Sequence, residues 1–276
     1  MRWKRGGISN DIEDLRASGG SRRPVGVKLG LGGLVALGLL SVVFKTDLIS
    51  PFMSVGGGAA VPAVSDPARD AREQKSVEFV SFVLDDAQSV WSQHLTGYRK
   101  AKLVLFRDGV QSGCGSAESS AGPFYCPADE KVYLDLGFFD ELRSRFRAPG
   151  EFAAAYVIAH EIGHHVQNVL GIERRVRALQ RQNRASASEL SVRMELQADC
   201  LAGVWAHSTA QRQLLESGDL ESGLGAASAV GDDRIQKETM GRVHPESFTH
   251  GSSAQRMQWF SRGYERGEVG ACETFN

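Results

Sequence analysis

The chain lacks the features that mark several large classes of protein. Its 32 Lys and Arg residues are balanced by 33 Asp and Glu residues, and the formal net charge of −1 gives no electrostatic case for binding nucleic acid. No segment repeats at the period of a solenoid. Cysteine is scarce, with four residues in 276, and the absence of a C-x-x-C pair argues against a cysteine metal site. We therefore expect no nucleic-acid partner.

Long uncharged stretches are also scarce, and the one that stands out is Leu29–Phe44, which has 16 residues. As a helix it would span about 24 Å. It approaches the roughly 30 Å of a hydrocarbon core if it extends to residue 49 and its flanking lysines snorkel. Basic residues precede it: Arg2, Lys4, Arg5, Arg16, Arg22, Arg23 and Lys28. The positive-inside rule predicts a cytoplasmic tail at 1–28, a transmembrane signal anchor at 29–49, and a periplasmic or extracellular remainder.

Two alternatives compete with the anchor. A cleaved signal peptide would use Ala59, Ala60 and Ala63 as cleavage context, but these lie well past the apolar run. A buried helix of a soluble domain is disfavoured because five glycines fall within or just before the stretch. Residues 50–70 are rich in Gly and Pro and are predicted to form a flexible linker. The folded domain is then expected at 71–276.

Within that domain, apolar spacing predicts a first helix from about Val77 to Leu95. Lys102–Phe106 and Lys131–Leu136 are predicted strands, separated by a loop rich in Gly and Ser. An extended substrate could add to the edge of one of these strands, with Val132–Leu136 the preferred candidate and a purely structural strand pair the alternative.

The most informative motif is His160-Glu161-x-x-His164, the H-E-x-x-H signature of zinc metallopeptidases. Residues i and i+4 lie on one face of a helix, so both histidines can reach one metal ion. Glu161 is placed to act as the general base for the metal's water. Apolar residues surround the motif and favour a buried helix: Val157, Ile158, Ile162, Val166 and Val169. The alternative, a buried helix without metal, is costly because it would bury two histidines and a glutamate.

A third protein ligand is needed for a tetrahedral catalytic site. The metzincin extension fails, because Gln167 and Leu170 stand where Gly and His are required. Downstream, Glu195 and Asp199 share one face of a predicted helix. Here the sequence resembles the gluzincin peptidases. The resemblance implies that Glu195 is the third zinc ligand and that Asp199 supports a ligand histidine, His160. A solvated acidic stripe is the alternative.

The resemblance narrows when further runs are included. Gly122–Pro127, the helix with H-E-I-G-H-H-V-Q, Glu195–Trp205 and the stretch from His250 to Phe260 occur in an order similar to that of the bacterial neutral zinc metallopeptidase family. This implies a membrane-anchored peptidase with one zinc ion, acting on a peptide or protein. The fold it implies is α+β: a mostly helical, zincin-like domain with a small antiparallel sheet.

The four cysteines allow three pairings. An extracytoplasmic location permits disulfides, and we favour Cys114–Cys126, which would staple a loop, and Cys200–Cys272, which would tie the C-terminal tail to the Glu195 helix. A free thiol at Cys200 is the alternative for the second pair.

Peptide hydrolysis also needs a donor for the developing oxyanion. His250 is the first candidate, because the Thr-His pair followed by a later Arg resembles an element of membrane-bound prenyl-protein endopeptidases. A capping or surface role for His250 is the alternative. Other candidate donors are His244, Tyr125, Tyr133 and Tyr156, whereas His165 points away from His164 and is predicted to be structural.

The expected function is a zinc-dependent endopeptidase with Glu161 as general base. Two other classes stay open: a non-catalytic zinc-containing binding or assembly protein of the cell envelope, and a hydrolase of cell-wall peptide amides. The presence of Glu161 argues against the first, and the absence of a peptidoglycan-binding repeat argues against the second.

Overall fold

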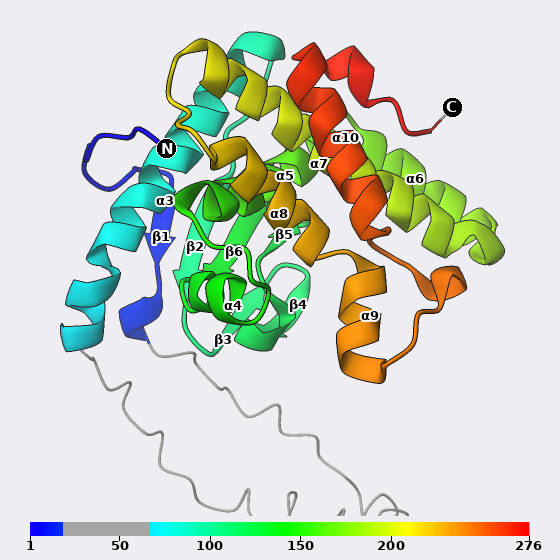
Figure 1. Ribbon diagram of the computed structural model, residues 1–276, viewed down its shortest axis with the longest axis horizontal. Coiled ribbons are helices and arrows are strands. Elements are labelled where there is room, and N and C mark those ends of the chain that lie inside the picture. Colours follow the sequence, from blue (N-terminus) through cyan, green and yellow to red (C-terminus); the bar gives the residue numbers. More distant parts are fainter. Residues whose placement is uncertain (19–66, 276) are drawn as a thin grey trace, which may run out of the picture.

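The computed structural model describes residues 1–18 and 67–275 (Figure 1). The predicted anchor at 29–49 and most of the predicted linker lie outside these residues. Within the two described ranges, no helix is long and apolar enough to cross a membrane.

A four-stranded sheet forms one side of the molecule, in the order β1-β2-β6-β5. Its strands are β1 (Ile12–Asp14), β2 (Lys102–Phe106), β6 (Lys131–Asp135) and β5 (Phe124–Cys126). The prediction of an antiparallel sheet was wrong. β1, β2 and β6 run parallel, and only β5, joined to β6 by a short turn, is antiparallel to it. The chain reaches parallel β6 because a long excursion follows β2, including the separate hairpin of β3 (Gly109–Ser112) and β4 (Gly115–Glu118).

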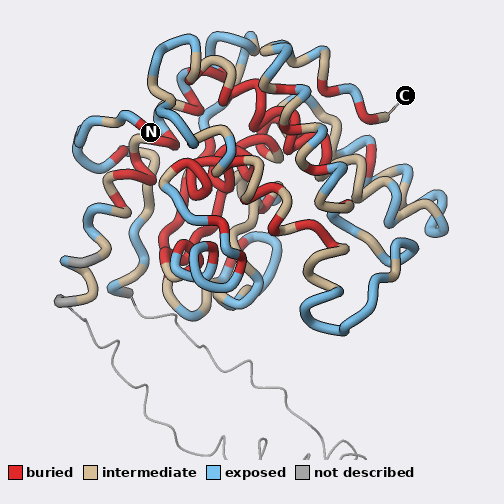
Figure 2. The backbone as a smooth tube through the Cα atoms, viewed as in Figure 1, coloured by how far each residue is buried: buried red, intermediate tan, exposed pale blue. Residues whose placement is uncertain are grey.

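Helices make up most of the described chain, as predicted. They are α3 (Pro67–His94), α4 (Phe138–Ser144), α5 (Glu151–Val169), α6 (Ile172–Gln182), α7 (Ala187–Gln211), α8 (Asp219–Ala229), α9 (Asp232–Met240) and α10 (Ser253–Arg266). α5 lies at the centre, packed between the sheet, α3, α7 and α8. Figure 2 shows that the most continuous buried backbone runs through this centre. The α+β class is therefore confirmed.

The N-terminal residues depart from the predicted boundaries. β1 pairs with β2, with Ile12 opposite Leu103, and the Trp3 ring packs against Phe79 and Phe82 of α3. Residues 1–18 are thus part of the folded body rather than a separate tail. The first helix also begins earlier than expected, at Pro67.

Close helix contacts bring the C-terminal half together. A Cβ at Gly163 of α5 would lie 2.9 Å from the Ala198 carbonyl oxygen of α7. A Cβ at Gly263 of α10 would lie 1.9 Å from the Cys200 carbonyl oxygen of α7. These glycines let the three backbones touch. Both predicted disulfides are present: Cys114–Cys126, and Cys200–Cys272, which ties α7 to the C-terminal tail.

Candidate metal centre

Three metal-ligating side chains converge where α5 crosses α7. His160 and His164 come from successive turns of α5, and Glu195 comes from α7. One ligand atom from each lies within 4.8 Å of the others. The Glu195 carboxylate bridges the pair, at 3.2 Å from His160 Nε2 and 3.4 Å from His164 Nε2. The predicted ligand set is therefore assembled in space.

The spacing of these atoms fits a tetrahedral zinc site. Donors about 2.0–2.1 Å from one zinc ion, at tetrahedral angles, lie roughly 3.4 Å apart. The His160 Nε2–Glu195 Oε2 and His164 Nε2–Glu195 Oε1 distances are close to that value, each nitrogen facing a different oxygen of the carboxylate. Two imidazole nitrogens and one carboxylate oxygen are also the donor types that catalytic zinc sites use. These residues would hold the ion and leave a position for water.

The electrostatics of the cluster favour a cation between its members. Burial lowers the pKa of His160, but the carboxylates of Asp199 and Glu195 outweigh it and raise the pKa to about 9. Burial likewise lowers the pKa of His164, and Glu195 raises it above its ordinary value. Burial raises the pKa of Glu195, yet the two histidines hold it well below the usual range. A bound divalent metal would replace these protons.

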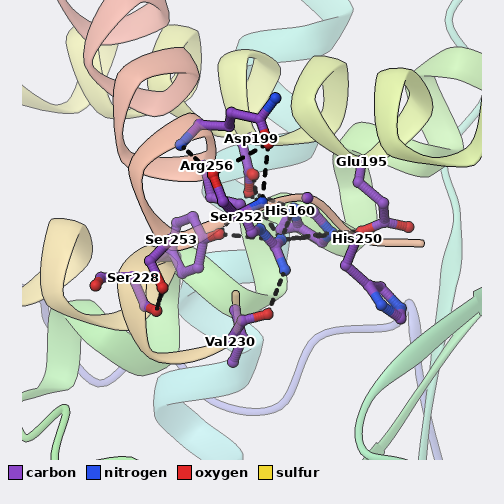
Figure 3. Close-up of polar contacts among 12 residues, drawn as sticks. His160, Glu195, Asp199, Ser228, Val230, His250, Ser252, Ser253 and Arg256 are labelled. Atoms are coloured by element: carbon purple, nitrogen blue, oxygen red, sulfur yellow. Dashed lines mark hydrogen bonds and ion pairs between the residues drawn. The ribbon is translucent and has the colours of Figure 1, made fainter. Parts of the chain in front are cut away.

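Asp199 contacts the ring of His160, the histidine that the resemblance assigns to it. Its Oδ1 atom is 2.8 Å from His160 Nδ1, which directs Nε2 towards Glu195. Asp199 is fully buried and accepts two hydrogen bonds from Arg256 of α10 (Figure 3). Arg256 Nε donates to Oδ2 at 2.8 Å, and Nη2 donates to Oδ1 at 3.0 Å. Burial raises the pKa of Asp199, and the Arg256 guanidinium, the largest opposing influence, brings it below the usual range. Tyr156, a predicted alternative oxyanion donor, donates to this same carboxylate.

His164 has an orienting partner that sequence reasoning missed. Gln167 accepts from His164 Nδ1 through its Oε1 atom at 2.8 Å. The amide nitrogen of Gln167 donates to the carbonyl oxygen of Met194, one residue before Glu195, at 2.7 Å. Gln167 had served only to exclude the metzincin pattern, although its i+3 spacing from His164 is itself a signal of contact on a helix.

A cleft of about 690 Å³ opens over the three ligands. Glu161 lines it together with the ligands, and its side chain comes from the same helix turn as His160. The prediction that Val132–Leu136 offers a free edge to an extended substrate was wrong, because this segment forms β6 and is paired on both sides, by β2 and β5. β5 is the edge strand on the cleft side, and its Phe124 and Tyr125 line the cleft.

His250 lines the same cleft, on the segment before α10. Asp232 fixes it: Oδ1 lies 3.1 Å from His250 Nδ1, and Oδ2 accepts the backbone N–H groups of Thr249, His250 and Gly251. The hydrogen bond to Asp232 raises the pKa of His250. Asp232 contacts Nδ1 of this ring and not Nε2. Asp232, at the start of α9, carried no sequence signal.

The remaining candidates have other partners. His165 is fully buried, with Nε2 on the Arg99 carbonyl oxygen and Nδ1 on the Tyr125 hydroxyl. The contact with Tyr125 fastens β5 to α5, so the structural interpretation of His165 agrees with its surroundings. Tyr133 donates to Asp129, and His244 pairs with Glu246. Neither of these two side chains is among those lining the cleft.

Comparisons with known proteins agree with this site. A family model described as "Putative neutral zinc metallopeptidase" matches residues 1–275. The protein YpfJ of Escherichia coli K12 is 45% identical over 286 aligned positions, which cover 100% of this chain and 99% of the relative. The protein Rv2575 of Mycobacterium tuberculosis H37Rv is 46% identical over 203 positions, covering 70% of this chain and 68% of the relative. No solved structure matches the chain significantly.

Proposed function

Because the chain belongs to the neutral zinc metallopeptidase family, we propose that it is a zinc-dependent endopeptidase whose metal is held by His160, His164 and Glu195. The observation that carries the proposal is the convergence of one ligand atom from each of these residues to within 4.8 Å of the others, beside a cleft that they line. A site serving only to stabilise the fold would be closed by a fourth protein ligand.

The chemistry divides between the ion and this chain's own residues. A zinc ion held by these three residues would supply a Lewis acid that lowers the pKa of water. Glu161 accepts the proton of the attacking water and returns it to the leaving amine. Asp199 and Gln167 keep the two ligand histidines in the tautomer that presents Nε2. His250, held through Nδ1 by Asp232, donates from Nε2 to the oxyanion that develops at the peptide carbonyl.

The cleft favours an extended peptide substrate. The outer edge of β5 has unpaired backbone groups within the described sheet, and a peptide can add to such an edge as a further strand. His165 and Asn168 both bond the Tyr125 hydroxyl, each at 3.0 Å, and so fix this edge relative to the zinc-binding helix. The substrate strand proposed here is therefore β5.

Membrane attachment through residues 29–49 and an extracytoplasmic domain are also part of the proposal. Both disulfides support an oxidising compartment, since such bonds are rare in reducing cytosol. The apolar run at Leu29–Phe44 supports a membrane segment.

The function is tested with zinc-loaded wild type and a Glu161→Gln variant on a proteome-derived peptide library. Both proteins should bind one zinc ion, and only the wild type should generate new peptide ends, detected by mass spectrometry. Glu189→Gln, an exposed change at the start of α7, is the matched control and should cleave like wild type. Equal cleavage by Glu161→Gln would sink the mechanism, and absence of cleavage by zinc-loaded wild type would sink the proposed activity.

A further inference from the structure

The first residues of the chain make an interface with the peptidase body that has both apolar and polar parts. Trp3 packs on two phenylalanines of α3, and its indole N–H donates to Glu151 Oε2 at 2.9 Å. Glu151 is the first residue of α5, the zinc-binding helix. Ser9, buried at 9% exposure, donates to Asp85 of α3 at 2.6 Å. This segment therefore touches the helix that carries the site.

The next residues complete the central sheet. β1 runs parallel to β2 over three registered pairs and covers an edge that would otherwise be unpaired. Ion pairs also tie it to the neighbouring strands. Lys102 of β2 contacts Asp11, and Lys131 of β6 contacts Glu13, each at 2.7 Å. A strand held by ladder bonds, ion pairs and core contacts is an integral part of the fold.

The end of the first described range, near residue 18, also contacts the start of the second, near residue 67. Arg16, just after β1, pairs with Glu73 in the first turns of α3 at 2.7 Å, and Arg69 pairs with the same carboxylate at 2.7 Å. Figure 1 shows the end of the first range beside the start of α3, at the lower left of the view. Both ends of the intervening stretch are thus attached to one edge of one body.

This arrangement conflicts with a single membrane crossing. A helix crossing once within 29–49 would put residues 1–18 and 67–276 on opposite sides of about 30 Å of hydrocarbon. The strand pairing and the Trp3, Ser9 and Arg16 contacts could then not form. Both parts cannot be folded together and separated by a bilayer.

We propose that residues 1–18 and 67–276 lie on the same side of the membrane, so that Leu29–Phe44 does not separate them. The family match begins at residue 1, so the docked segment belongs to the pattern that the family shares. This topology differs from the single-pass one predicted from basic residues, and it holds whether or not the protein is a peptidase.

A cross-link in the full chain, in intact bacterial cells, tests the proposal. Ser9→Cys with Asp85→Cys places two thiols on short side chains whose native atoms are 2.6 Å apart. A short, membrane-permeant dithiol-reactive linker should join them in most molecules, seen as a shift in gel mobility. The control pairs Ser9→Cys with Arg184→Cys, at the tip of the α6–α7 hairpin at the opposite end of the long axis (Figure 1). Cross-linking no greater than this control would overturn the proposal.

A second measurement does not depend on those substitutions. A small epitope is inserted between Gly6 and Gly7, which are exposed with open space around them, and a second epitope follows residue 276. Antibody access is then compared before and after selective permeabilisation of the inner membrane. If both epitopes become accessible to antibody at the same stage, whether before or after permeabilisation, they lie in one compartment. Opposite accessibility in membrane-inserted, full-length protein refutes it.

Discussion

Replacing Arg256 by Met should damage both the stability of the protein and its affinity for zinc, because the guanidinium contacts Asp199 and its Nη2 atom lies 3.4 Å from His160 Nε2 and 3.9 Å from Glu195 Oε2. Its side chain is 4% exposed and makes two hydrogen bonds to Asp199 and one to the Val230 carbonyl oxygen at 3.2 Å. Asp199 in turn holds His160 Nδ1. The guanidinium therefore acts on the site both through the buried Asp199 carboxylate and through its own contact with the His160 ring.

The size of the effect follows from this burial. Asp199 has 0% side-chain exposure, so removing the Arg256 guanidinium leaves a buried carboxylate that only His160 and Tyr156 still contact. Breaking a buried pair in this way typically costs about 3–5 kcal/mol. The Asp199 carboxylate would also lose the contact that opposes its desolvation, and its hold on His160 would weaken. Loss of such support to a ligand histidine lowers metal affinity by about 10–100-fold.

Stability is measured by urea unfolding of chelator-treated protein, and zinc affinity by competition with a chelating dye. Arg262→Met is the matched control, because Arg262 is exposed on the same helix and should change stability by about 0.5 kcal/mol or less. Arg256→Lys keeps the charge but loses the paired geometry, and should fall between wild type and Arg256→Met. If Arg256→Met matches the Arg262→Met control in both assays, the account of the buried pair is wrong.

Four further outcomes are expected. Glu195→Ala should abolish stoichiometric zinc binding in metal analysis, and retained zinc at wild-type affinity would exclude Glu195 as a ligand. His250→Ala should lower kcat by about 10²–10³-fold with little change in zinc content, and a change of only a few-fold would assign His250 to the surface. Gly263→Ala should strongly destabilise the fold, because its Cβ would lie 1.9 Å from the Cys200 carbonyl oxygen and would force α10 off α7; an unchanged Tm would contradict this packing. In metal-free protein, the stability that His160 contributes should be complete below pH 6.5 and lost as pH rises through about 9, because its folded-state pKa is raised. The free energy of unfolding, measured as a function of pH, should show this loss without zinc. It should no longer show it when the protein is saturated with zinc.

Interpretations of single segments mostly agree with the structure. The strands predicted at Lys102–Phe106 and Lys131–Leu136 match β2 and β6 closely, because apolar, β-branched runs between turn residues are local signals. The positions of these strands within the sheet were not predicted by the same local signals. Val132–Leu136 was the preferred edge strand, yet the three-residue β5 takes that position. Which strand lies at an edge depends on pairing between distant segments, and no local pattern specifies it.

Partners across the fold were partly visible in sequence. Glu195 and Asp199 share a helix face by i,i+4 spacing, and the resemblance to gluzincins supplied their roles. Asp232 could not be found in this way, because it meets His250 only through a fold that brings α9 to the segment before α10. Gln167 stands three residues after His164, a spacing that indicates contact on a helix, but it was compared only with the metzincin pattern.

The sequence by itself determined that two histidines and a glutamate would occupy one stretch of buried helix, because 3.6 residues per turn fixes the directions of their side chains. It also limited the cysteines to three pairings. Only the tertiary structure decided that Arg256 would neutralise Asp199, that β5 would border the cleft, and that residues 1–18 would join the folded body. Each of these depends on contacts between residues far apart in the chain, where packing of complementary surfaces, rather than local periodicity, selects the partner.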